Sequence, residues 1–173
     1  MYKVGEYVVK ANAGICVITE IVQMALESST EKQYYVLLPK DDKRLKMFVP
    51  VDADRTRIRP VMTGAEAMDF IYCMDEIEAE WILNDKQREQ RYKETLRSND
   101  PADLVSIIKS LYQRGQERLA RGKKITATDE RYFKQAEEAL YTELGFALEK
   151  TNEEIRALIN STMEQKKKAL AQA

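Results

Sequence analysis

The sequence predicts an α+β protein in which a small β-barrel comes first and an all-helical domain follows. Over the first sixty residues, short runs of β-branched and aromatic residues alternate with turn signals, as is typical of short strands. After Pro60 the apolar residues recur with the period of a helix. We therefore expect a barrel domain at residues 1–62 and a helical domain at residues 63–173.

The barrel domain is predicted to contain five short strands. The expected strands cover residues 6–10, 15–22, 33–38, 46–51 and 56–60. Asn12-Ala13-Gly14 supplies a turn after the first strand, and Pro39 ends the third strand before the charged turn Lys40–Lys43. Short strands at this spacing favour a small barrel, which either closes on itself or keeps one edge free for a partner strand.

The helical domain carries clear helix starts. Thr63 and Glu66 have the spacing of a capping box, in which a hydroxyl and a carboxylate bind free backbone N–H groups. Asp100-Pro101 gives an N-cap followed by proline at the first helical position. Thr126 and Thr151 precede two more helices. We therefore expect four capped helices, with a basic helix between the first two.

Trp81 is the only tryptophan in the chain, and its role depends on where the first helix ends. Four residues follow one another at helical steps of four, three and four, namely Phe70, Met74, Ile77 and Trp81. This spacing favours a first helix that continues to Trp81 and a tryptophan packed in the helical core. The functional alternative is an exposed aromatic ring that stacks against a nucleic-acid base.

The composition argues against an enzyme or a membrane protein. The chain has no histidine, which is the commonest general base and a usual zinc ligand, and no glycine-rich phosphate loop. Cys16 and Cys73 lie far apart in sequence and are expected to be reduced. The acidic group at residues 75–80 is best explained as a solvated face. We therefore expect no catalytic activity, no metal and no cofactor. We also expect a cytoplasmic protein, since no apolar run approaches the roughly 20 residues of a membrane span.

Positive charge is concentrated in one part of a chain whose net charge is −1. Residues 81–134 hold thirteen basic and eight acidic residues, whereas residues 63–80 hold six acidic residues and no basic one. This distribution fits either a face that binds a polyanion or a solvated helix surface with pairs such as Glu89 with Lys93. The basic residues that recur along the expected helices are Lys86, Arg88, Arg91, Lys93, Arg97, Arg114, Arg118, Arg121, Lys123 and Lys124.

Six short segments, in order along residues 2 to about 148, resemble the CarD/CdnL family of bacterial transcription regulators. The N-terminal module of this family is shared with the transcription-repair coupling factor. The segments are Lys3–Val9, Met47–Val51, Arg57–Arg59, Arg91–Leu96, Leu111–Arg118 and Glu143–Leu148. Their order and spacing, taken together, carry the resemblance.

The resemblance implies a Tudor-like barrel that binds the β subunit of RNA polymerase, partly by strand addition. It also implies a helical domain that contacts promoter double-stranded DNA at the upstream edge of the melted region and modulates open-complex stability. The polymerase-binding residues implied are Gln23, Met24, Lys46, Met47 and Phe48. The DNA-binding residues that fit this role are Arg88, Arg91, Lys93, Arg114, Arg118, Arg121, Lys123, Lys124 and Arg131. We expect a monomer that is associated with the nucleoid through RNA polymerase.

The sequence also departs from the family pattern. The family's wedging tryptophan stands four residues before the tyrosine of its Arg-Tyr-Lys segment, and this position is Arg88 here. The wedge role is not transferred to Trp81, and Arg88 is instead expected to suit a narrow minor groove. The connection at residues 119–125 is longer and more basic than is usual in the family. Glu130 stands where a basic residue is common. Residues 151–173 extend beyond the family core. These departures leave open a protein-interaction adaptor whose helical domain binds another protein, and the sequence leaves open whether transcription rises or falls.

Overall fold

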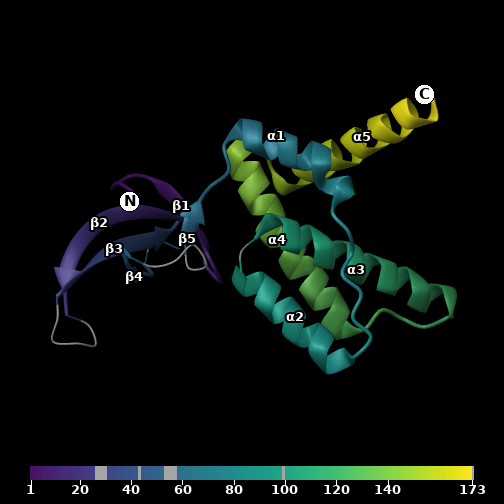
Figure 1. The fold of residues 1–173 in the computed structure, drawn as a ribbon, viewed down its shortest axis with the longest axis horizontal. Coiled ribbons are helices and arrows are strands. Elements are labelled where there is room, and N and C mark those ends of the chain that lie inside the picture. The colour runs from purple at the N-terminus through teal and green to yellow at the C-terminus, as the bar shows by residue number, and fades with distance from the viewer. Residues whose placement is uncertain (26–30, 43, 53–57, 99, 173) are drawn as a thin grey trace. The chain divides into compact units, whose positions relative to one another are not determined.

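The computed structural model describes residues 1–25, 31–42, 44–52, 58–98 and 100–172. It confirms the predicted α+β class, because five strands come first and helices follow (Figure 1). The chain divides into two compact units, Met1–Val61 and Met62–Ala173. We call these the sheet unit and the helical unit.

The sheet unit is a five-stranded antiparallel sheet with the strand order β4-β3-β2-β1-β5. Its strands are β1 (Tyr7–Lys10), β2 (Gly14–Met24), β3 (Lys32–Pro39), β4 (Met47–Pro50) and β5 (Ile58–Pro60). Residues 56 and 57 of the predicted fifth strand lie outside the described residues. Pairing between β4 and β5, which would close a barrel, is not seen among the described residues, so closure stays a prediction.

The core of the sheet unit is built from the inward-facing residues of its strands. Five side chains from β1, β2 and β3 are at most 1% exposed, namely Val8, Cys16, Ile18, Tyr35 and Leu37. A β-bulge between Ile18 and Glu20 interrupts the pairing of β2 with β3, and such bulges bend a strand. Burial raises the pKa of Cys16 to about 11, so this cysteine is a neutral, apolar thiol of the core.

The helical unit contains five helices in the described part of the chain. They are α1 (Gly64–Cys73), α2 (Asp85–Ser98), α3 (Pro101–Ala120), α4 (Ala127–Leu148) and α5 (Asn152–Ala171), and the 3₁₀ turn η1 (Met74–Glu76) follows α1. The predicted capping box at Thr63 is present, and the Asp100 side chain caps α3 as predicted; Thr151, predicted only to precede a helix, forms a second capping box with Glu154. Local bonds between side chain and backbone therefore set where these helices begin.

The prediction that the first helix continues to Trp81 is wrong, because α1 ends earlier and the backbone of Ile77 is extended (φ −72°, ψ 121°). The Nζ of Lys109 on α3 donates hydrogen bonds to the backbone oxygens of Met74, Asp75 and Ile77, at 2.8, 2.9 and 2.5 Å. In a continued helix, these oxygens would accept bonds from N–H groups four residues later. A lysine that is distant in sequence thus provides another partner for the end of the helix.

The core of the helical unit lies mainly between α3 and α4. Its central side chains are at most 3% exposed, namely Leu104, Ile107, Leu111, Leu140 and Leu144. The helix α5 joins this core through Ile155, which is fully buried. The C-terminal helix, which extends beyond the family core, is therefore packed on the rest of the unit. None of the helices described is long and apolar enough to cross a membrane.

Candidate nucleic-acid interface

An extended segment, residues 77–84, crosses α3, and we call it the Trp81 loop. Ser106 and Ser110, one turn apart on α3, bind its backbone. The Ser106 Oγ donates to the oxygen of Glu78 at 2.8 Å and accepts from the N–H of Glu80 at 3.2 Å. The Ser110 Oγ donates to the backbone oxygen of Glu80 at 2.5 Å. These bonds fix the path of a loop that has no regular structure of its own.

The Arg88 guanidinium fixes the other end of the Trp81 loop. Arg88 is 8% exposed and donates to the backbone oxygens of Ile82 at 3.0 Å and Leu83 at 3.4 Å. It is also paired with Asp85, and the hydrogen bond from Arg88 is the main reason that the pKa of this carboxyl lies below its usual value. The predicted contact of Arg88 with DNA stays a prediction, and it would require these bonds to break.

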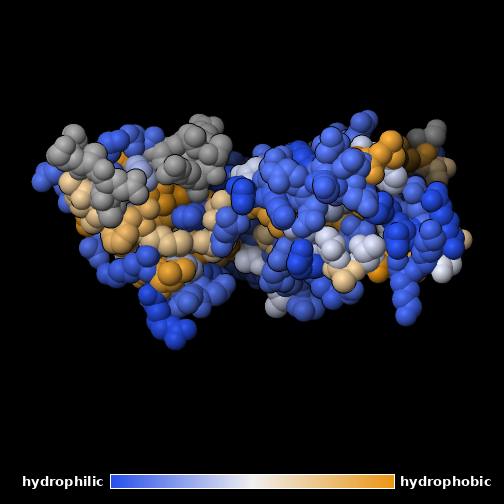
Figure 2. All heavy atoms as spheres, turned by 90° about the horizontal axis from the view of Figure 1, so that it is seen from below, coloured by the Kyte–Doolittle hydropathy of each residue, from blue (hydrophilic) through white to orange (hydrophobic). Residues whose placement is uncertain are grey.

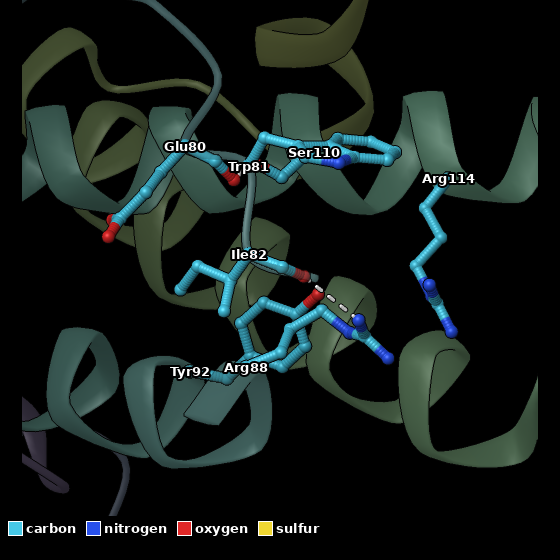
Figure 3. Close-up of a pocket in the computed structure, with 7 residues that line it drawn as sticks. All are labelled: Glu80, Trp81, Ile82, Arg88, Tyr92, Ser110 and Arg114. Carbon is cyan, nitrogen blue, oxygen red and sulfur yellow. Dashed lines mark hydrogen bonds between the residues drawn. The ribbon is translucent and has the colours of Figure 1, made fainter. Parts of the chain in front are cut away.

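The space between the Trp81 loop and α2 is nearly filled. Tyr92 of α2 is 3% exposed, and burial raises its pKa to about 12. The pocket that remains is about 10 Å³, which is room for about one water molecule. Its lining is drawn in Figure 3 and consists of Glu80, Trp81, Ile82, Arg88, Tyr92, Ser110 and Arg114. The arrangement is therefore a support for the loop rather than a ligand site.

Trp81 lies at the surface, so the prediction that it packs in the helical core is wrong. The residue is 48% exposed. Figure 3 shows the loop that carries it crossing α3, with Arg88 and Tyr92 on the side of α2. The helical spacing that favoured burial requires a continuous helix, and the helix has already ended. A polar triplet on the α3 face, Ser106, Lys109 and Ser110, is the sequence signal that could have indicated a backbone segment lying against it.

Two further predicted DNA-binding residues are held in ion pairs within the unit. Arg91 binds Glu80 at 2.7 Å and Asp103 at 3.4 Å, and the hydrogen bond to Glu80 raises the pKa of Arg91. Arg114 binds the buried carboxylate of Asp129 at 2.9 Å. The side chains of Arg91 and Arg114 keep 29% and 22% of their surface exposed, so each presents only part of its guanidinium to solvent.

Three other predicted residues have partners at the surface. The pair of Glu89 with Lys93, expected as the structural alternative, is present at 3.2 Å. Arg131 lies 4.0 Å from the same carboxylate of Glu89, and Arg118 donates to the backbone oxygen of Lys124 at 2.9 Å. Exposed ion pairs contribute little free energy in water, so these side chains can exchange their partners for phosphates at small cost.

Arg121, Lys123 and Lys124 form an exposed turn between α3 and α4, which we call the basic turn. The helix α3 ends here in a Schellman motif, in which the N–H of Lys123 bonds the oxygen of Arg118 at 2.8 Å. Gly122 has a φ of +71°, a conformation that glycine adopts without strain. None of the ion pairs found in the described part of the chain includes a side chain of the basic turn. The face of the helical unit drawn in Figure 2 is mainly hydrophilic.

The predicted polymerase-binding residues lie on two strands of the sheet unit. Two stand at the end of β2 and three at or just before β4, namely Gln23, Met24, Lys46, Met47 and Phe48. The strand β3 separates the two groups, and Val36 of β3 pairs with Phe48 on one side and with Glu20 on the other. Among the described strands β4 pairs with β3 alone, and Phe48 is 44% exposed. The strand β4 thus offers an edge and an aromatic side chain to a partner.

Family models match both halves of the chain. The family model for the CarD-like/TRCF RID domain matches residues 2–62, and the model for the CarD C-terminal domain matches residues 72–160. No curated protein matches the chain. The first match spans the sheet unit, and the second spans α2, α3, α4 and the first part of α5. The chain therefore belongs to the CarD family.

Proposed function

We propose that this protein binds the β subunit of RNA polymerase through its sheet unit and promoter double-stranded DNA through its helical unit. The DNA contact is at the upstream edge of the melted region, and its effect is a change in the stability of the open complex. Family membership makes the chain an RNA polymerase-associated transcription regulator. The finer proposal is supported by the edge of β4, the Trp81 loop and the basic turn.

The polymerase contact is assigned to the outer edge of β4. An end strand can accept a strand from a partner through main-chain hydrogen bonds, and neighbouring side chains then give specificity. Phe48 supplies an exposed aromatic anchor beside this edge. Met47 is half-buried on the same strand, so only part of its side chain is available to a partner.

The exposed indole of Trp81 on a fixed loop is the observation that carries the DNA contact. An aromatic ring at the protein surface can stack on a base that has lost its neighbour, as occurs at the edge of melted DNA. Ser106, Ser110 and Arg88 hold the backbone on both sides of Trp81. The loop therefore need not be ordered on binding, which lowers the entropic cost of the contact.

The basic residues of α3 extend the proposed DNA-binding surface from Trp81 towards the basic turn. Arg114 lies beside Trp81, and Arg118 and Arg121 follow at steps of four and three along one face of the helix. Arg121 is therefore about 10 Å further along the axis, at the basic turn. Such a row positions a protein on the phosphate backbone, whereas the ring contacts the bases.

A few cations are enough for the helical unit to bind DNA in this arrangement, because polymerase binding holds the unit near the promoter. A tethered second contact gains from a high effective concentration, so its own affinity for DNA can be weak. This fits a surface on which several arginines are already engaged in pairs within the unit.

The lifetime of the polymerase–promoter open complex after addition of a DNA competitor tests the proposal. We expect Trp81→Ala to raise at least fivefold the protein concentration that gives half of the maximal change in open-complex lifetime, because stacking on one base contributes about 1–3 kcal/mol. Tyr112→Ala is the matched control, since Tyr112 is 59% exposed on α3 but lies about 200° around the helix from Ser110. Equal effects of the two variants would contradict the proposal.

A second candidate function is a protein-interaction adaptor, which is favoured by the internal engagement of Arg88, Arg91 and Arg114. Titration of salt into a complex of the full chain with a promoter duplex separates the two functions. Three or more phosphate contacts predict that log K falls with log salt at a slope of about −3 or steeper. A flat dependence would favour a protein partner for the helical unit.

A further inference from the structure

A pocket in the helical unit is lined by no residue of the Trp81 loop or the basic turn. Its volume is about 330 Å³, within the range of roughly 300–1,000 Å³ that is usual for small-molecule sites. Its walls are aliphatic side chains from α3, α4 and α5, namely Val105, Ile108, Leu140, Ile159 and Met163. Ile108, Ile159 and Met163 are only partly buried, so apolar surface that the fold has not covered faces the pocket.

The wall formed by α5 is fixed by a clamp near the end of that helix. The Lys166 Nζ donates to the backbone oxygen of Tyr72 at 2.7 Å and binds the carboxylate of Asp75 at 2.6 Å. It also lies 4.4 Å from the centre of the Tyr72 ring. Met163 and Lys167 are therefore held in place by the contact of α5 with α1 and η1, although both lie beyond residue 160, where the family match ends.

The polar groups of the pocket carry net positive charge. Two ammonium groups, from Lys109 and Lys167, line it together with the Asp75 carboxylate, which is already paired through the α5 clamp. The Lys109 Nζ is bonded to three backbone oxygens, which carry no net charge to offset its own. Glu137, which accepts a hydrogen bond from a lining tyrosine, is paired with Arg156 at 3.3 Å. The pocket thus combines aliphatic walls with a net positive charge from its lining residues.

We propose that this pocket binds an amphipathic anion, consisting of an unbranched alkyl chain that ends in a carboxylate. The alkyl chain lies against Ile108, Ile159 and Met163, and the carboxylate binds the exposed ammonium group of Lys167. This binding activity goes beyond the proposed roles in polymerase and DNA binding and does not depend on them.

Two quantities follow from this assignment. Each methylene added to the ligand tightens binding roughly fourfold until the pocket is full, because burial of one methylene contributes about 0.8 kcal/mol. Loss of the Lys167 ammonium group weakens binding roughly two- to fivefold, the usual range for a partly exposed ion pair. A ligand of the same chain length with a cationic head group binds more weakly than the carboxylate.

Calorimetric titration of the full-length protein with hexanoate, octanoate and decanoate, below the concentrations at which micelles form, tests the proposal. We expect saturable one-site binding that tightens with chain length, and weaker binding of decyltrimethylammonium. Binding that is absent, that does not saturate, or that is as tight for the cationic ligand would overturn the proposal.

Two variants locate the site. Lys167→Gln is expected to weaken decanoate binding, whereas Lys168→Gln, which changes an exposed neighbour that does not line the pocket, is expected to leave it unchanged. Met163→Trp fills the pocket and is expected to weaken binding at least tenfold, with circular dichroism as the check that the helices remain folded. Equal affinities of the two lysine variants would overturn the proposal, as would undiminished binding by folded Met163→Trp.

Discussion

Replacing Arg88 with methionine tests whether its guanidinium holds the Trp81 loop. Methionine keeps much of the packing of the aliphatic stem but removes the donors to the backbone oxygens of Ile82 and Leu83. A hydrogen bond from a charged donor contributes about 1.5–3 kcal/mol. The bond to Leu83 is long, at 3.4 Å, and oxygens freed in the variant partly regain water. We therefore expect Arg88→Met to lower the free energy of unfolding of the helical unit by about 2 kcal/mol.

Two signals measure this prediction on the full chain. Urea unfolding followed by helical circular dichroism gives the change in the free energy of unfolding. The emission of Trp81, the only tryptophan, reports the loop itself before any urea is added, and we expect a red shift as the indole gains water. Arg97→Met is the matched control, an exposed arginine on the same helix whose replacement should change stability by less than about 0.5 kcal/mol. Equal stabilities of the two variants, with unchanged emission from Trp81, would refute the reasoning.

Two further predictions concern charge. Replacing all three cations of the basic turn with glutamine should make the salt dependence of DNA binding shallower by about 2–3 units of slope, because each lost phosphate contact removes about 0.9. An unchanged slope would show that the basic turn does not contact phosphate. The hydrogen bond from Lys166 is the main cause that holds the pKa of Asp75 below its usual value. This pair therefore stabilises the folded state above about pH 4, and the stabilisation is lost as the pH falls through the lowered pKa. Hydrogen exchange of the α5 amides should therefore be slower in wild type than in Lys166→Gln at pH 6, with the difference decreasing as the pH is lowered below about 4, and a difference that does not decrease would contradict this assignment.

The helix starts and the strands could be predicted because the signals that set them are local. The capping boxes at Thr63 and Thr151 and the cap at Asp100 each involve residues at most three apart, so the sequence pattern contains the whole interaction. The same holds for the strands, whose boundaries follow from neighbouring turn residues. Of the candidate site, the exposed basic turn could be predicted because Gly122 and its charged neighbours are adjacent in sequence.

The position of Trp81 and the burial of Arg88 could not be predicted, because both depend on contacts between distant residues. The first helix ends just before Met74 and Asp75, whose backbone oxygens are bound by Lys109, more than thirty residues later. Arg88 is buried because the extended loop provides backbone oxygens for its guanidinium. A helical spacing of apolar residues cannot report an interaction of this kind, since periodicity describes one element at a time.

The affinity of the full chain for RNA polymerase, measured for wild type, Phe48→Ala and Trp81→Ala, tests the division of labour most directly. If the sheet unit carries the polymerase contact, Phe48→Ala should weaken binding at least tenfold, since an aromatic anchor at an interface contributes about 2 kcal/mol or more. Trp81→Ala should bind the polymerase as wild type does while losing its effect on the open complex. Undiminished binding by Phe48→Ala, or a loss of polymerase binding in Trp81→Ala, would contradict the account.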